Sequence, residues 1–164
     1  MPAVGDVESM KLQDAAYIAG FFDGEGCVTI VRRRPKPTAS YWLLVGLTNT
    51  DLQILLWIQS IVGGKICNKT RRSIKHAPGF ELRITRKQEM YNFLIYIQPF
   101  VRIKKRQVET ALAFLELKKV KMVMSESRGK TWPLMAASPE DAVTRETFKT
   151  IMNDLNRRGP LCLQ

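Results

Sequence analysis

The sequence predicts an α+β fold in which an antiparallel sheet carries helices on one face. Segments with a helical spacing of apolar residues alternate with segments rich in β-branched residues, in the order helix, strand, strand, helix, strand, strand, helix. The expected strands alternate apolar residues with polar or basic ones, as strands do when only one face of a sheet is covered. The 164 residues are enough for one domain with a hydrophobic core.

The first half of the chain predicts a helix, two strands and a second helix. Apolar residues at helical spacing follow Leu12, and two glycines end that helix. Residues 27–34 and 41–48 are rich in β-branched and apolar residues and are separated by prolines, so we expect two strands joined by a loop. Residues 51–62 again have helical spacing, and Thr50 is placed to cap that helix.

The second half predicts another strand pair and further helices. Residues 65–73 and 80–86 form the strands, with a turn at His76-Ala-Pro-Gly79 between them. Three helices follow, with a loop over 125–137 between the last two: 88–97, 107–123 and 139–158. The chain therefore divides into a leader (1–11), a core (12–123) and a C-terminal helical extension (124–164), which we expect to pack against the core.

Positive charge is concentrated in the middle of the chain, which has a formal net charge of +11. Residues 27–86 carry eleven basic and two acidic side chains, whereas residues 1–26 carry one basic and five acidic ones. A concentrated positive surface favours a polyanion such as nucleic acid as partner. Charge alone leaves a generically basic protein as the alternative.

Composition argues against several other classes of protein. No apolar run reaches the roughly 18 residues of a membrane span, and no secretory signal is visible. The cysteines are odd in number and widely spaced, which is typical of a reducing compartment: Cys27, Cys67 and Cys162. With the single His76 they make a poor zinc site. We therefore expect an intracellular protein, in the cytoplasm or an organelle, without a membrane partner.

Residues 18–26, IAGFFDGEG, carry the candidate chemistry. Small residues on one helix face allow a second helix to approach closely. The residues expected on that face are Ala16, Ala19, Gly20 and Asp23. The helix then ends at two carboxylates, Asp23 and Glu25, with no Lys or Arg nearby. Mg²⁺ is commonly held by one or two carboxylates, so a metal site is expected here. A solvated acidic turn is the alternative.

This segment resembles the LAGLIDADG motif of homing endonucleases, with Ile18 in place of the first leucine and Glu25 in place of the penultimate aspartate. Residues 92–106 resemble the stretch that follows the second strand pair in single-motif members, and the resemblance covers roughly residues 12–120. It implies an αββαββα LAGLIDADG endonuclease-like fold, in which the antiparallel sheet forms a DNA-binding saddle. The helix at 139–158 is an addition to that core.

The resemblance also implies metal-dependent catalysis. In the family the penultimate acidic residue of the motif binds a divalent cation, which here is Glu25, with the Gly24 carbonyl as a second ligand. Mg²⁺ is the expected metal, and Mn²⁺ or Ca²⁺ can occupy such a site. Lys104 matches the family's basic residue near the active site. Thr48 and Asn49 are the candidates for a polar residue that orients water.

One motif per chain implies a homodimer, because a double-strand break needs two cuts and a two-fold dimer binds a roughly palindromic double-stranded DNA. Asp23 is expected to brace the helix end and not to bind metal.

Outward strand residues would contact DNA. They are Thr29, Val31, Arg33, Tyr41, Lys65, Cys67, Lys69, Arg71, Arg83 and Thr85.

Two alternatives share the fold. The chain could be a maturase that binds intron RNA and aids splicing, and the sequence leaves this open. It could also be a DNA-binding regulator that does not cleave, but the retained Glu25 argues against that.

Overall fold

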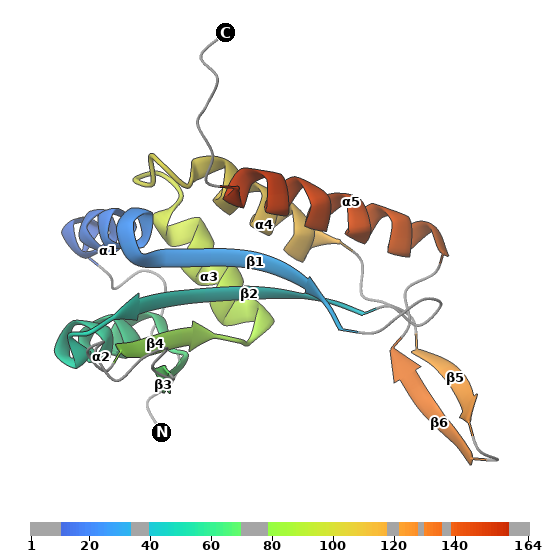
Figure 1. Ribbon diagram of the computed structural model, residues 1–164. Helices are drawn as coiled ribbons and strands as arrows, with labels where there is room; N and C mark the ends of the chain where they lie inside the picture. Colours follow the sequence, from blue (N-terminus) through green and yellow to red (C-terminus); the bar gives the residue numbers. More distant parts are fainter. Residues whose placement is uncertain are drawn as a thin grey trace, which may run out of the picture.

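A computed structural model describes residues 11–33, 40–69, 79–117, 122–127, 130–135 and 139–157. The order of helices and strands predicted for the core is confirmed (Figure 1). The elements are α1 (Leu12–Glu25), β1 (Gly26–Arg32), β2 (Tyr41–Asn49), α2 (Leu52–Val62), β3 (Lys65–Lys69), β4 (Gly79–Ile84), α3 (Lys87–Ile97), α4 (Lys105–Glu116), β5 (Met122–Ser127), β6 (Lys130–Met135) and α5 (Pro139–Asn156).

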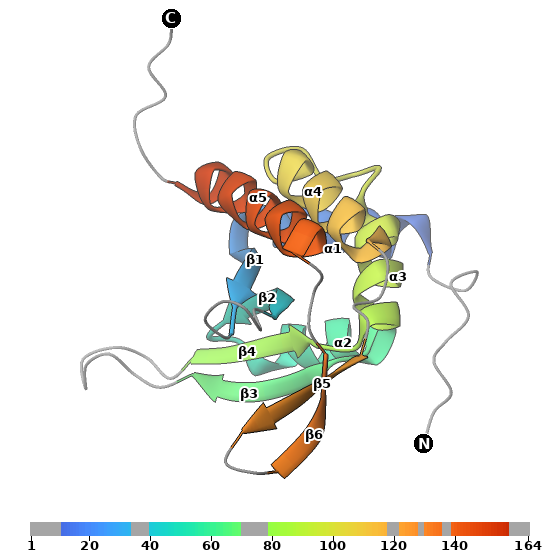
Figure 2. The ribbon, with the colours of Figure 1, turned by 90° about the vertical axis from the view of Figure 1, so that its right-hand side faces the viewer.

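The first four strands form one antiparallel sheet in the order β1-β2-β4-β3. The register places Gly26 opposite Leu47 and Lys65 opposite Arg83. Helices α4 and α5 lie side by side next to β1, as Figures 1 and 2 show from two directions. Helix α5 thus covers the edge strand of the sheet, which limits pairing with other chains.

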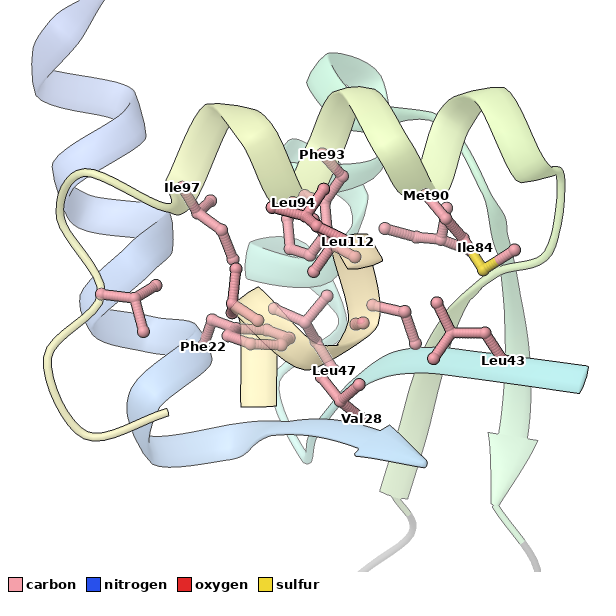
Figure 3. Packing of buried hydrophobic residues seen from close by; sticks show 14 of the residues in the cluster. Phe22, Val28, Leu43, Leu47, Ile84, Met90, Phe93, Leu94, Ile97 and Leu112 are labelled. Carbon is pink, nitrogen blue, oxygen red and sulfur yellow. The ribbon is translucent and has the colours of Figure 1, made fainter. Parts of the chain in front are cut away.

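Helices and sheet enclose one hydrophobic core (Figure 3). From the sheet it receives every second residue of the strands, such as Val28, Leu43 and Leu47, all buried. From the helices it receives Phe22 and Phe93, whose rings meet edge to face with centroids 5.5 Å apart. Burial of one strand face against helices is what the alternating pattern predicts. Side chains on the other face of the sheet, such as Trp42 and Leu44, are exposed.

The structure corrects the expected cap of α2. The carboxylate of Asp51, and not Thr50, accepts a hydrogen bond from the backbone N–H of Gln53 at 2.8 Å. The Oδ1 of Asn49 in turn accepts from the N–H of Asp51 at 2.8 Å. A carboxylate is a stronger acceptor for these amides than a threonine hydroxyl, so the helix begins one residue later.

The segment after α4 also differs from expectation. The helix predicted over 107–123 runs from Lys105 to Glu116, and residues 118–121 lie outside the described part. The predicted loop over 125–137 is wrong: β5 and β6 pair as a separate antiparallel sheet, with Ser125 opposite Trp132. Two residues separate these strands in the sequence, and a two-residue spacing is typical of a hairpin.

Candidate active site and nucleic-acid interface

Glu25 lies at the junction between α1 and the sheet. It is the last residue of α1, and Gly26 already pairs with Leu47 as the first residue of β1. The Glu25 side chain is exposed and forms no ion pair or hydrogen bond with the described residues. Its carboxylate is therefore available to a ligand from solvent.

Asp23 braces the end of α1, as expected. Its Oδ2 accepts hydrogen bonds from the backbone N–H groups of Arg102 at 2.8 Å and Ile103 at 3.1 Å, and its Oδ1 accepts from that of Lys104 at 2.9 Å. These amides lie just before α4, where Lys104 is the N-cap residue. One carboxylate thus joins the end of α1 to the start of α4.

These contacts also set the pKa of Asp23. Partial burial acts to raise it, but the three backbone N–H groups and the charge of Lys104 outweigh burial, so the pKa of Asp23 lies below its ordinary value of 3.8. Hydrogen bonds to the charged form favour that form. Asp23 is therefore ionised at neutral pH, and both of its carboxylate oxygens accept hydrogen bonds from its own chain.

Replacement of Asp23 by alanine should lower the free energy of unfolding by about 1–2 kcal/mol at pH 7, since it removes charge-assisted hydrogen bonds that solvent partly screens. Because folding lowers the pKa of Asp23, its stabilising effect is complete above the ordinary value of 3.8 and is lost as pH falls below it. Thermal unfolding from pH 7 to pH 2.5 checks this: the difference in Tm between wild type and variant should disappear in acid. A difference in Tm that is the same at every pH, or that equals the difference for the exposed control Glu109→Ala, would contradict the prediction.

Lys104 reaches the same junction, since its Nζ donates a hydrogen bond to the backbone carbonyl of Asp23. Thr48 lies one residue after Leu47, the partner of Gly26, so it too lies near this end of the sheet. Its Oγ1 accepts from Lys69 Nζ at 3.3 Å. The structure therefore places Lys104 and Thr48 near the end of α1.

Asn49 is the next residue of β2, but its side chain holds the turn before α2 through the Asp51 amide. In the described ranges no group of three or more His, Cys, Asp or Glu side chains could hold a metal ion. Each chain therefore presents one uncommitted carboxylate at this junction, that of Glu25.

The open face of the sheet divides into two halves of different chemistry. The β3–β4 half is charged and carries Lys65, Cys67, Lys69, Glu81 and Arg83. The β1–β2 half is uncharged and carries Cys27, Thr29, Val31, Trp42, Leu44, Gly46 and Thr48. Arg33 lies just beyond β1, with its guanidinium 4.8 Å from the centre of the Trp42 ring. Thr85, which follows β4, is exposed, and Arg71 lies outside the described residues.

Tyr41 does not belong to this face, which corrects the prediction for it. Its hydroxyl donates a hydrogen bond to Glu146 Oε2 on α5 at 2.6 Å, so the side chain lies on the helix side of the sheet. Burial, and then the hydrogen bond to Glu146, raise the pKa of Tyr41 to about 12. The alternation of β2 explains the placement, because Tyr41 has the same parity as the buried Leu43 and Val45.

Sequence reasoning missed Trp42 and Leu44 as members of the open face. Both are large, apolar and exposed, to 50% and 40%. The signal was present in the same alternation: once Leu43 and Val45 face the core, the residues between them must face outward.

The face of α1 expected to meet a second helix is partly corrected. Ala16 and Gly20 are exposed, but Ala19 is fully buried in the core and Asp23 is held by its own chain. One row of exposed residues recurs every four positions: Leu12, Ala16, Gly20 and Gly24. Because Gly20 and Gly24 have nothing within 4 Å of where a Cβ would stand, this stripe is open to close approach.

None of the helices in the described ranges is both long and apolar enough to cross a membrane. Comparison with known proteins supports the resemblance. Residues 18–120 match the family model described as LAGLIDADG endonuclease. No curated protein sequence matches the chain.

Solved structures share the fold at low sequence identity. The homing endonuclease I-CvuI, in complex with its target and Ca, has a TM-score of 0.65 and 16% identity over 91% of this chain and 85% of that one. The archaeal intron-encoded I-Vdi141I, complexed with DNA, has a TM-score of 0.65 and 15% identity over 93% and 89%. I-SmaMI, bound to cleaved DNA, has a TM-score of 0.60 and 14% identity over 95% of this chain but 48% of its own.

Proposed function

Because the chain belongs to the LAGLIDADG endonuclease family, we propose that it is a homing endonuclease that makes a metal-dependent double-strand break in a long, roughly palindromic DNA site as a homodimer. The family and the DNA-bound neighbours support site-specific DNA cleavage. The observation that carries the proposal is the exposed, uncommitted Glu25 carboxylate at the junction of α1 and the sheet.

Each site residue has a role that fits its position. Glu25 would hold a divalent cation, Mg²⁺ in the first place, with the Gly24 carbonyl as second ligand; Mn²⁺ or Ca²⁺ could replace it. A divalent cation supplies an activated water and stabilises the leaving oxygen. Lys104, held at the end of α1 by the Asp23 carbonyl, is placed to stabilise negative charge on the phosphate. Thr48 and Asn49 are the candidates for orienting water, and Thr48 has the better case because Asn49 holds a turn.

Two observations support a homodimer: the number of uncommitted carboxylates that one chain presents, and the length of the chain relative to I-SmaMI. One chain presents one uncommitted acid near the end of α1, whereas hydrolysis of two strands requires two catalytic centres. One chain also aligns with only about half of I-SmaMI, so two copies are needed to match that length. We place the contact on the outward stripe of α1, which starts at the 74%-exposed Leu12.

Replacing Gly20 with leucine should disrupt this dimer and spare the protomer. The side chain would enter open space in the single chain, so the helical content should not change. In a dimer it would separate two helices that otherwise meet closely, and we expect self-association to weaken at least about tenfold, equivalent to ~1.4 kcal/mol. Sedimentation analysis measures this. The matched control is Ala113→Leu on the exposed side of α4. A wild type that is monomeric at all concentrations, or a Gly20→Leu dimer as stable as wild type, would contradict the arrangement.

DNA contacts would come from the open face of the sheet. Lys65 and Lys69 on β3 are exposed and suited to phosphate oxygens. Arg83 is oriented by Glu81, whose Oε2 accepts from Arg83 Nε at 2.9 Å and Nη2 at 2.7 Å. A guanidinium with one edge held in this way presents its remaining donors to a base edge, and guanine is the common partner.

The C-terminal extension would stabilise the DNA-binding strands. Asn156 Nδ2, in the last turn of α5, donates to the Val28 carbonyl of β1 at 2.7 Å. Near the middle of α5, Glu146 accepts from Tyr41 of β2 and lies 3.7 Å from Arg32 of β1. We therefore retain the division into leader, core and extension, and assign the extension the task of supporting β1 and β2.

Site selection from a randomised DNA library tests the function. Wild type with Mg²⁺ should cut both strands of the selected site, and a chelator should stop cleavage. Failure to cut any selected site with Mg²⁺, Mn²⁺ or other divalent cations would overturn the proposal. Tight binding of intron RNA in place of DNA would favour the maturase alternative, for which the comparisons give no support.

A further inference from the structure

An apolar patch interrupts a surface that is otherwise polar and basic. Trp42 and Leu44 are exposed to 50% and 40% on the open face, and Val31 lies opposite Trp42 across the β1–β2 pair. We call these three residues the apolar patch. It is continuous with the charged β3–β4 half, because β2 pairs with both β1 and β4. Neighbouring exposed apolar side chains, unlike single scattered ones, mark candidate binding surfaces.

The patch is suited to one feature of DNA. Its side chains carry no charge, and their only hydrogen-bond donor is the indole N–H of Trp42, so they contribute little to the general attraction of the basic surface. Among the base edges in the major groove, only thymine presents an apolar group, the C5-methyl. An aliphatic side chain against that methyl excludes water from both surfaces.

We propose that the β1–β2 half of the sheet recognises thymine methyl groups through Leu44 and Trp42, whereas the β3–β4 half contacts phosphates and guanine. This inference rests on the proposed function and adds a base preference to it. The guanidinium of Arg33 lies over the Trp42 ring and adds positive charge beside the patch.

The position of these thymines follows from strand geometry. Leu44 lies three residues from Leu47, which pairs with the first residue after Glu25, and Trp42 lies five residues from it. At about 3.3 Å per strand residue these separations are roughly 10 and 17 Å. With about 3.4 Å between base pairs, the two thymines should lie roughly three and five base pairs outward from each cleavage position.

Replacement of thymine by deoxyuridine tests the proposal, because it removes only the C5-methyl. Each thymine of the selected site near those positions is replaced in turn, and Kd is measured without Mg²⁺ so that cleavage does not intervene. Wild type should lose about fourfold in affinity per contacted methyl, the factor equivalent to ~0.8 kcal/mol. The Leu44→Ala variant should bind DNA with thymine and DNA with deoxyuridine equally at one of these positions.

The control is Ile95→Ala on α3, which has the same exposed fraction as Leu44 but lies on the helix layer. It should keep the full sensitivity to deoxyuridine. A wild type that cuts its selected site but ignores every deoxyuridine replacement would overturn this inference and leave the proposed function standing. Sensitivity that persists unchanged in both Leu44→Ala and Trp42→Ala would also overturn it. Absence of any selected site would overturn both proposals.

Discussion

Glu25→Gln is expected to reduce the rate of DNA cleavage by about 10³-fold or more while DNA binding is retained. Glutamine keeps the size of the side chain but loses the charge that would hold a divalent cation against the phosphate. The fold should not suffer, because Glu25 is exposed and has no ion pair with the described residues. Affinity for DNA should stay equal or rise slightly, since one negative charge beside the phosphates is removed.

The measurement is the single-turnover cleavage rate on the selected site with Mg²⁺, together with Kd for the same DNA. Glu116→Gln serves as the matched control, because Glu116 is an exposed carboxylate at the end of α4 opposite Lys104. It should cleave as wild type does. If Glu25→Gln cleaved within a few-fold of wild type, Glu25 would have no place in the mechanism, and the family assignment would stand without its metal site.

Much of the fold was predictable because each element has a strong local pattern. The strands over residues 27–48 alternate buried and exposed residues, and the structure keeps that alternation in its register. The cap of α2 was assigned to Thr50 because both residue types occur at helix N-termini, although the adjacent Asp51 is the stronger acceptor. The β5–β6 pair was missed because a helical pattern was extended past Glu116.

The residues of the candidate site could be predicted from the sequence, but their arrangement in space could not. The motif pointed to Glu25 and Lys104, but only the folded chain brings Lys104 to the end of α1, through contacts that span about eighty residues. Spacings of three and four residues share one helix face, so the pattern could not tell that Ala19 turns inward while Gly20 turns outward. Tyr41 was misplaced because its amphipathic side chain fits either sheet face, and only its parity with Leu43 and Val45 assigns it to the helix side.

Gly26→Ala should be the most destabilising small change in the motif. A Cβ atom at position 26 would lie 2.5 Å from the carbonyl oxygen of Phe22 and 2.7 Å from its Cε2 atom. Phe22 is fully buried against Phe93, so its ring cannot swing aside, and its carbonyl belongs to the helix backbone. The backbone of Gly26, with φ −77° and ψ 153°, is accessible to any residue, so the penalty is steric.

We expect the free energy of unfolding to fall by about 3 kcal/mol, the upper end for overpacking, and Tm by roughly 6–12 °C. Gly79→Ala is the control, because a Cβ there would make only an ordinary contact, 3.7 Å from Lys69 Cβ. A loss of Tm no larger than in that control would mean that the junction of α1 and β1 can relax. The final glycine of the motif would then serve the active site and not the packing. A large loss of Tm in Gly26→Ala but not in the control would instead show that this glycine is required for packing, because α1 must turn into β1 directly over the Phe22 ring. The same turn places Glu25 at the edge of the sheet.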